Sequence, residues 1–297
     1  MSCPWDKPFR LADGRLFCGA HGLIVCERCG VDYSDVDDVV GDSIGGRLRT
    51  TEEHENNVDR PGALGLERLD PIRHMEISIG RGSVLPTVFV PPPSATPQSL
   101  FPADIAHKVH PPAKRFIRVD DPKSFLIYTS GTCFGKGPAE LRGGWAFVFG
   151  PQEPNTTSSV RERLENEGPL GRLVHPESNR AELRAIVGAL RYRNWASEGF
   201  TTLVLATTSD YIVRGATEWI RAWLQRGWSK GNGELVSNMD MWQVFLGEVE
   251  RWHEYGVKIQ LWKIPRKCNT ETHRLAKEGA QLGGGFSFND RLDITHG

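Results

Sequence analysis

The order of apolar segments between residues 116 and 282 constrains the fold of this chain more than any other sequence feature. Short apolar runs rich in β-formers indicate buried strands, whereas apolar residues that recur every three or four positions indicate amphipathic helices. Three strands come first, the first two as a hairpin, and then a helix, a strand, two helices, a strand and a helix. This order predicts an α/β domain with helices packed on a mixed sheet. The expected strands are 125–129, 145–149, 160–167, 201–207 and 257–264, and the expected helices are 179–195, 211–225, 239–255 and 270–281.

Composition divides the chain into four regions. Residues 1–35 contain a cysteine cluster, and residues 116–282 contain the α/β pattern. Residues 36–115 mix acidic stretches with a proline-rich run, a composition that predicts a mostly extended linker. The Gly-rich residues 283–297 are expected to form a flexible tail. The apolar side chains of the linker have the alternative of docking on the neighbouring domain, namely Val88, Phe89, Val90, Leu100 and Phe101.

The cysteine cluster has the spacing of a metal site. Cys18 and His21 form one close pair of ligands, and Cys26 and Cys29 form a second pair. Two such pairs can close a tetrahedral Zn²⁺ site, so we expect a small structural zinc knuckle, in which Cys3 can replace Cys18 or His21. The alternative is reduced free thiols with an incidental histidine. Such knuckles bind proteins or nucleic acid, and the spacing does not say which.

Composition also bears on the binding partners and the cellular location of the chain. The net charge is −1, which gives no strong basic footprint for nucleic acid. No run of 18 apolar residues and no apolar signal core is present, so we expect no membrane partner. Few cysteines, most of them in a metal-like cluster, favour an intracellular location, cytoplasmic or nuclear.

Six sequence boxes in the α/β region resemble the ribonuclease H type 1 family in content and order. The first runs Tyr-Thr-Ser-Gly-Thr-Cys, where the family has Tyr-Thr-Asp-Gly-Ser/Ala-Cys. Another runs Ser-Asn-Arg-Ala-Glu-Leu, similar to the Asn-Asn-Arg-Ala-Glu-Leu that opens the family's first helix. The boxes are Tyr128–Cys133, Gly143–Ala146, Ser178–Leu183, Ala206–Val213, Trp219–Trp242 and Asn269–Ala276.

The resemblance implies a ribonuclease H-like five-stranded mixed sheet with flanking helices. It also implies a site where four carboxylates hold two divalent ions that cleave RNA in RNA–DNA hybrids. The four positions here are Ser130, Glu182, Thr208 and His273, so only Glu182 is retained. Hydroxyls are weak neutral ligands and an imidazole is a poor ligand for Mg²⁺. We therefore expect almost no catalysis by two metal ions.

The leading hypothesis is a pseudoenzyme that binds nucleic acid or acts as a scaffold. By resemblance, Thr132 and Asn179 would contact an RNA–DNA hybrid, or double-stranded RNA. One alternative is an active hybrid ribonuclease with an altered site for Mg²⁺ or Mn²⁺, in which Asp210 substitutes for a lost acid or His273 and Glu182 hold a softer ion. The other alternative is a factor that binds only proteins, through the zinc knuckle and the proline-rich linker.

Overall fold

The computed structural model describes residues 77–109, 112–135, 140–154 and 156–291, together with four short strands among the first 32 residues. The chain divides into two compact units, residues 1–73 and residues 74–297.

The first unit contains two short antiparallel pairs of strands. Strand β1 (Phe9–Arg10) pairs with β2 (Leu16–Phe17), and β3 (Val25–Cys26) pairs with β4 (Val31–Asp32). Cys26 therefore lies on a strand. The other expected zinc ligands, Cys18, His21 and Cys29, and the alternative ligand Cys3, lie outside the described residues.

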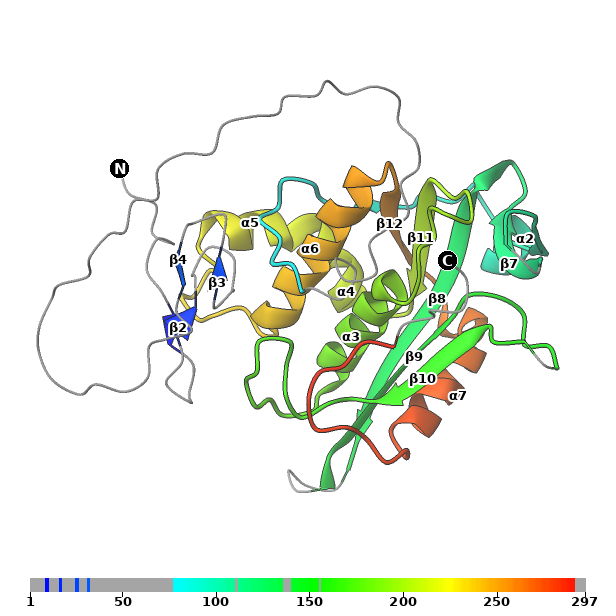
Figure 1. The fold of residues 1–297 in the computed structure, drawn as a ribbon. Coiled ribbons are helices and arrows are strands. Elements are labelled where there is room, and N and C mark those ends of the chain that lie inside the picture. Colours follow the sequence, from blue (N-terminus) through cyan, green and yellow to red (C-terminus); the bar gives the residue numbers. More distant parts are fainter. Residues whose placement is uncertain are drawn as a thin grey trace, which may run out of the picture. The chain divides into compact units, whose positions relative to one another are not determined.

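The second unit is built on an eight-stranded sheet (Figure 1). The 14-residue strand β8 (Asp121–Phe134) is at its centre, antiparallel to β9 and parallel to β11. Strand order runs β10-β9-β8-β11-β12-β5, and β7 joins β6 to the first half of β8. The other strands are β5 (Thr87–Val88), β6 (Ala103–Ala106), β7 (Ala113–Arg118), β9 (Arg142–Val148), β10 (Ser159–Arg163), β11 (Thr202–Thr207) and β12 (Lys258–Lys263). All five expected strands form, and β5, β6 and β7 are additional strands.

Two hydrophobic clusters cover the two faces of this sheet. Successive side chains of a strand point to opposite faces. On β8, Phe125 and Ile127 belong to one cluster, and Leu126 and Tyr128 belong to the other. Both faces of the central strands are buried, which explains why their sequence reads as continuous apolar runs.

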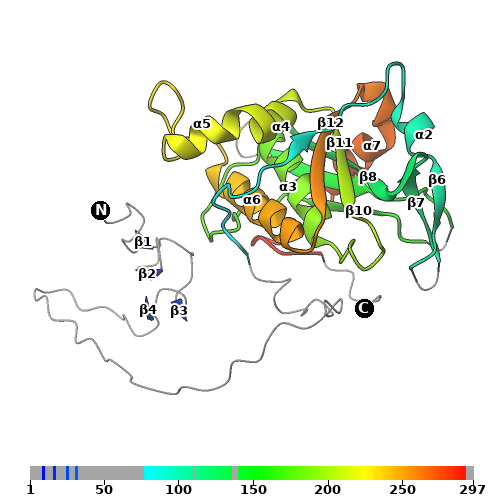
Figure 2. The ribbon, with the colours of Figure 1, turned by 90° about the horizontal axis from the view of Figure 1, so that it is seen from above.

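The helices divide between the two faces, as the two views show (Figures 1 and 2). Helices α3 and α6 contribute to the cluster that contains Phe125, whereas α7 contributes to the cluster that contains Leu126. The expected helix 211–225 forms as α4, a π-helical turn η2 and α5, which follow one another directly. The helices are α2 (Pro97–Leu100), α3 (Ser178–Arg191), α4 (Asp210–Arg214), η2 (Gly215–Trp219), α5 (Ile220–Gln225), α6 (Met239–Glu254), the 3₁₀ turn η3 (Arg266–Cys268) and α7 (Thr270–Gly279).

The folded domain begins earlier than residue 116, where the linker was expected to end. Strand β5 extends the sheet beside β12, and the backbone N–H of Phe89 donates to the carbonyl of Leu261. Phe89 and Phe101 are buried against Trp262, with ring centroids 4.9 and 6.1 Å from that of the tryptophan. The docking alternative is therefore the one observed for Phe89, Leu100 and Phe101, while Val88 and Val90 are exposed.

The first residues of the expected tail are also docked. The carboxylate of Asp290 pairs with Arg191 of α3 at 2.6 Å, and the carbonyl of Asn289 accepts from Arg184 at 2.7 Å. The Arg184 guanidinium lies 4.2 Å from the ring centroid of Phe288. Buried arginines on α3 need partners, and this segment supplies them.

Candidate functional site

The end of strand β8 lies against the first turn of α3, and this approach builds the site. A Cβ on Gly131 would lie 2.1 Å from the backbone nitrogen of Glu182, so only glycine allows the two backbones to come this close. The contact places Ser130, the residue before Gly131, beside the helix turn that carries Glu182. Gly131, in the same sequence box as Ser130, thus fixes the position of Ser130 relative to Glu182.

His273 of α7 completes a chain of polar contacts above Ser130. The Oγ of Ser130 lies 3.4 Å from Nδ1 of His273, and Nη2 of Arg266 lies 2.7 Å from Nε2 of the same ring. A guanidinium has no acceptor, so Nε2 must accept and Nδ1 carries the proton that points toward Ser130. The ring is therefore neutral in this arrangement. Partial burial and the charges of Arg266 and Lys277 all hold the pKa of His273 below its ordinary value.

Glu182 lies at the floor of the site and is buried. The hydroxyl of Thr207 donates to its Oε2 at 3.1 Å. Burial raises the pKa of Glu182 to about 7, although the backbone of Gly131 and the hydroxyl of Thr207 act in the opposite direction. The pKa of the retained acid therefore lies above that of an exposed glutamate, because burial disfavours the charged carboxylate.

Thr208 follows directly after β11, next to the residue that contacts Glu182, and it is partly buried. All four positions implied by the resemblance thus come from β8, α3, α7 and the end of β11. Asp210, the suggested substitute acid, is exposed, and its carboxylate pairs with Lys263 at 2.6 Å and Arg214 at 3.8 Å. These ion pairs lower the pKa of Asp210 and occupy the oxygens that a metal ion would need.

The two expected nucleic-acid contacts flank the site. Thr132 follows Ser130 by two positions on β8, so both side chains lie on the same face of the strand. Asn179 precedes Glu182 by three positions on α3, which places both on one side of the helix. Asn179 is exposed and Thr132 partly exposed, so both are accessible.

The donor set does not fit a pair of divalent ions. Mg²⁺ prefers charged oxygen ligands, and only Glu182 among the four positions offers one. Among the described residues, no group of three or more His, Cys, Asp or Glu side chains is arranged to hold a metal ion.

Two residues of the candidate site, Arg266 and Asn269, were not predicted from the sequence. The contact of Arg266 with His273 was not anticipated, although the pair Arg266–Lys267 immediately before the last helix is a visible basic signal. Asn269 was not anticipated either. Its side-chain amide donates to the carbonyl of Thr129 at 2.9 Å, which ties the start of α7 to β8 next to Ser130.

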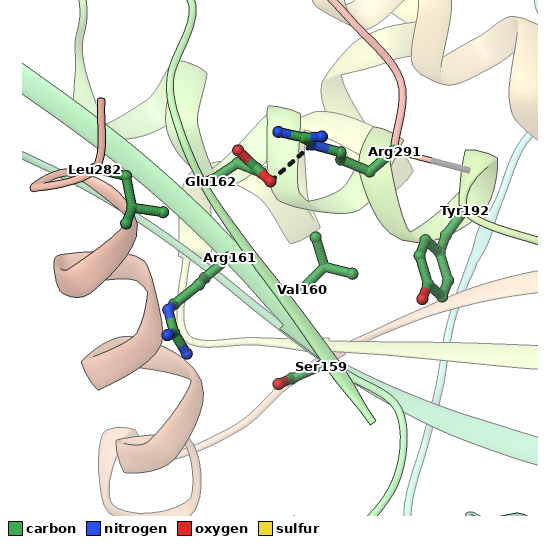
Figure 3. A pocket seen from close by; sticks show the side chains of 7 residues that line it. All are labelled: Ser159, Val160, Arg161, Glu162, Tyr192, Leu282 and Arg291. Carbon is green, nitrogen blue, oxygen red and sulfur yellow. Dashed lines mark ion pairs between the residues drawn. The ribbon is translucent and has the colours of Figure 1, made fainter. Parts of the chain in front are cut away.

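Two hollows lie outside this group of residues. One of about 310 Å³ is lined by Tyr211, Trp219, Trp223 and Lys230, among others. Trp223 is nevertheless largely buried, so its ring belongs to the packing of the domain. The other hollow, of about 470 Å³, lies along β10, where Arg291 pairs with Glu162 at 2.7 Å (Figure 3).

No helix within the described parts of the chain is long and apolar enough to cross a membrane.

The second unit is similar in sequence to known proteins. A family model described as RNase H matches residues 122–281, which is more than half of the chain. A ribonuclease H of Wolbachia pipientis wMel is 31% identical over 156 residues, which are 52% of this chain and 94% of the relative. A ribonuclease H of a Cyanothece species is 36% identical over 121 residues, which are 40% of this chain and 66% of that relative.

A solved structure, LC9-RNase H1, described as a type 1 RNase H with the type 2 active-site motif, is 23% identical in sequence. The match has a TM-score of 0.37 and covers 56% of this chain and 76% of that one.

Proposed function

Because the chain belongs to the ribonuclease H family, we propose that it is a member that no longer cleaves RNA in RNA–DNA hybrids. In this proposal the domain binds nucleic acid or serves as a scaffold. The observation that carries the proposal is that three of the four carboxylate positions are neutral in this chain, and two of them, Ser130 and His273, lie side by side.

The three altered positions change the charge of the site. Two divalent ions about 4 Å apart repel one another strongly, and the family's carboxylates offset that repulsion. Here three negative charges are lost, and Arg266 adds a positive charge next to His273. Among the four positions, Glu182 alone would have to offset the charge of both ions. We therefore expect this site to bind neutral or anionic ligands in preference to divalent cations.

Retained nucleic-acid binding is supported by the accessible positions of Thr132 and Asn179 beside the site. It is opposed by Glu177, an exposed carboxylate at the N-terminus of α3, to which the amide of Asn238 donates. A carboxylate at this point repels a backbone phosphate. We therefore expect weaker binding of a hybrid than in a metal-dependent relative.

The deciding experiment incubates the full-length chain with a labelled RNA–DNA hybrid in Mg²⁺ and, separately, in Mn²⁺. We expect intact hybrid in both cases and saturable binding in a parallel gel-shift assay. Cleavage that disappears in Glu182→Gln would refute the proposal and establish the active alternative. No cleavage and no binding of hybrid or double-stranded RNA would favour a purely protein-binding factor.

For the first unit, we propose a structural zinc ion held by Cys18, His21, Cys26 and Cys29. The support is their spacing together with the pairing of β3 and β4, which brackets Cys29 in sequence. Elemental analysis of the purified chain should give one zinc per molecule. A double Cys26→Ser, Cys29→Ser variant should lose that zinc, whereas Cys133→Ser and Cys268→Ser, at the two free cysteines of the second unit, should retain it.

A further inference from the structure

The pocket of the lost carboxylates has a basic rim. Arg266, in η3, contacts His273 through Nη2, and Lys277 lies one helical turn after His273 on α7. The imidazole that contacts Arg266 lies 3.4 Å from the hydroxyl of Ser130, and Lys277 shares one face of α7 with His273, so both cations lie at the same site as Ser130. Both side chains are exposed, so their charged groups are accessible from solvent.

These cations differ from their neighbours in lacking an acidic partner. Within the described residues, neither Arg266 nor Lys277 forms an ion pair with a carboxylate. Arg274, on the same helix, pairs with both Glu271 and Glu278. Two exposed cations without carboxylate partners, close to the same imidazole, create a local positive potential that attracts an anion.

The site also offers suitable donors for a phosphate. The guanidinium of Arg266 uses Nη2 toward His273, and its remaining N–H groups fit a fork of two oxygens. The Lys277 ammonium supplies a second, mobile point charge. Glu182, the one acid retained at the four positions, is buried and accepts from the hydroxyl of Thr207 instead of pairing with either cation.

We propose that this pocket binds a phosphate-ester oxyanion directly through Arg266 and Lys277, without a divalent ion. The inference deepens the proposed function, on which it rests: where a relative would hold the phosphate through metal ions, this chain holds it through its own cations. The same chemistry is offered by a nucleic-acid backbone and by free phosphate, and the experiment separates the two.

The test measures binding of a fluorescent RNA–DNA hybrid to the full chain by anisotropy, in EDTA and at several salt concentrations. We expect Arg266→Gln and Lys277→Gln each to weaken binding about fivefold and to reduce the salt slope by about one. Arg274→Gln is the matched control, because it removes the same charge from α7 at a position where two glutamates already neutralise it. We expect less than a twofold change there.

A second measurement follows the imidazole of His273 by NMR as inorganic phosphate is added. Saturable shifts that disappear in Arg266→Gln support the pocket, whichever source the phosphate has.

The outcomes separate the two proposals. If wild type binds hybrid and both Gln variants bind it equally well, the pocket assignment is overturned while the proposed function stands. A tenfold loss in EDTA that Mg²⁺ restores overturns binding without metal. If wild type binds no hybrid, the proposed nucleic-acid function fails, and the phosphate titration decides the pocket: shifts at His273 support it, and their absence overturns it.

Discussion

The hydroxyl of Ser130 lies 3.4 Å from Nδ1 of His273, so two positions that carry acids in related enzymes contact each other directly. Nδ1 must hold a proton because Nε2 accepts from Arg266. The contact is long for a hydrogen bond, yet it gives both groups a polar neighbour without a metal ion between them. The changes at the two positions are thus structurally compatible with each other.

The Ser130→Asp substitution tests this contact. A carboxylate at this distance favours the imidazolium, so the pKa of His273 should rise from its lowered value to above the ordinary range. NMR titration of the imidazole provides the measurement. Ser130→Ala removes the hydroxyl without adding a charge, and it should leave the pKa low. An unchanged pKa in Ser130→Asp would show that the two side chains do not face each other in solution.

Restoring all three acids should restore the metal site. In the triple variant Ser130→Asp, Thr208→Asp, His273→Asp, the three new aspartates and Glu182 would together supply four carboxylates to the site. We expect Mn²⁺ binding by calorimetry, absent in the wild type, and detectable cleavage of an RNA–DNA hybrid. Adding Glu182→Gln to the triple variant should abolish both signals. Metal binding that survives this fourth change would come from elsewhere in the chain.

Glu182 should make stability depend on pH. Its pKa is raised from 4.5 to about 7 in the folded chain, so the folded state binds more protons than the unfolded state between these values. The contribution of Glu182 to the free energy of unfolding is fully present below about pH 4.5. It falls as the pH rises toward 7, by about 3 kcal/mol in total. Glu182→Gln removes this fall, so the variant should be more stable than wild type at pH 8 and similar at pH 4.

Urea unfolding across this pH range measures the effect. Glu271→Gln is the control, because Glu271 is exposed and its pKa is lowered by Arg274. That variant should follow the wild-type profile above pH 5. A wild-type profile that is flat between pH 5 and 8 would contradict the burial of an ionisable Glu182.

The segment before β8 should contribute strongly to stability. Phe89→Ala would leave a cavity beside Phe101 and Trp262, at a cost of about 3 kcal/mol in the free energy of unfolding. Val90, the next residue, is 80% exposed, and Val90→Ala should change stability by less than about 0.5 kcal/mol. Equal effects at the two positions would mean that this segment does not dock.

The docked residues after α7 make a related prediction. Asp290→Ala removes one of two acids that pair with Arg191, a guanidinium that is almost fully buried with Glu248. We expect a loss of about 2 kcal/mol, because the remaining acid compensates the buried charge only in part. Arg291→Ala breaks a more exposed pair with Glu162 and should cost less than about 1 kcal/mol. Thermal unfolding of both variants provides the comparison.

Local patterns made most of the core predictable. The strands at β8, β9, β11 and β12 were predicted because apolar runs bounded by polar residues reflect burial on both faces. The four candidate positions Ser130, Glu182, Thr208 and His273 were proposed together because their boxes keep family order, and their role stays a prediction. Arg266 was not among them, since its role depends on the direction of one side chain across the gap between η3 and α7.

The sequence by itself determined the α/β order, the family and the identity of the three altered positions beside Glu182, because periodicity and motif order are written along the chain. Only the tertiary structure decided where the domain begins, since Phe89 and Phe101 are apolar residues in a proline-rich stretch whose partner, Trp262, is far away in sequence. The charge of the pocket was also a tertiary result. Ser130, Arg266 and His273 come from different elements, and their contacts arise from the packing of α7 on the sheet.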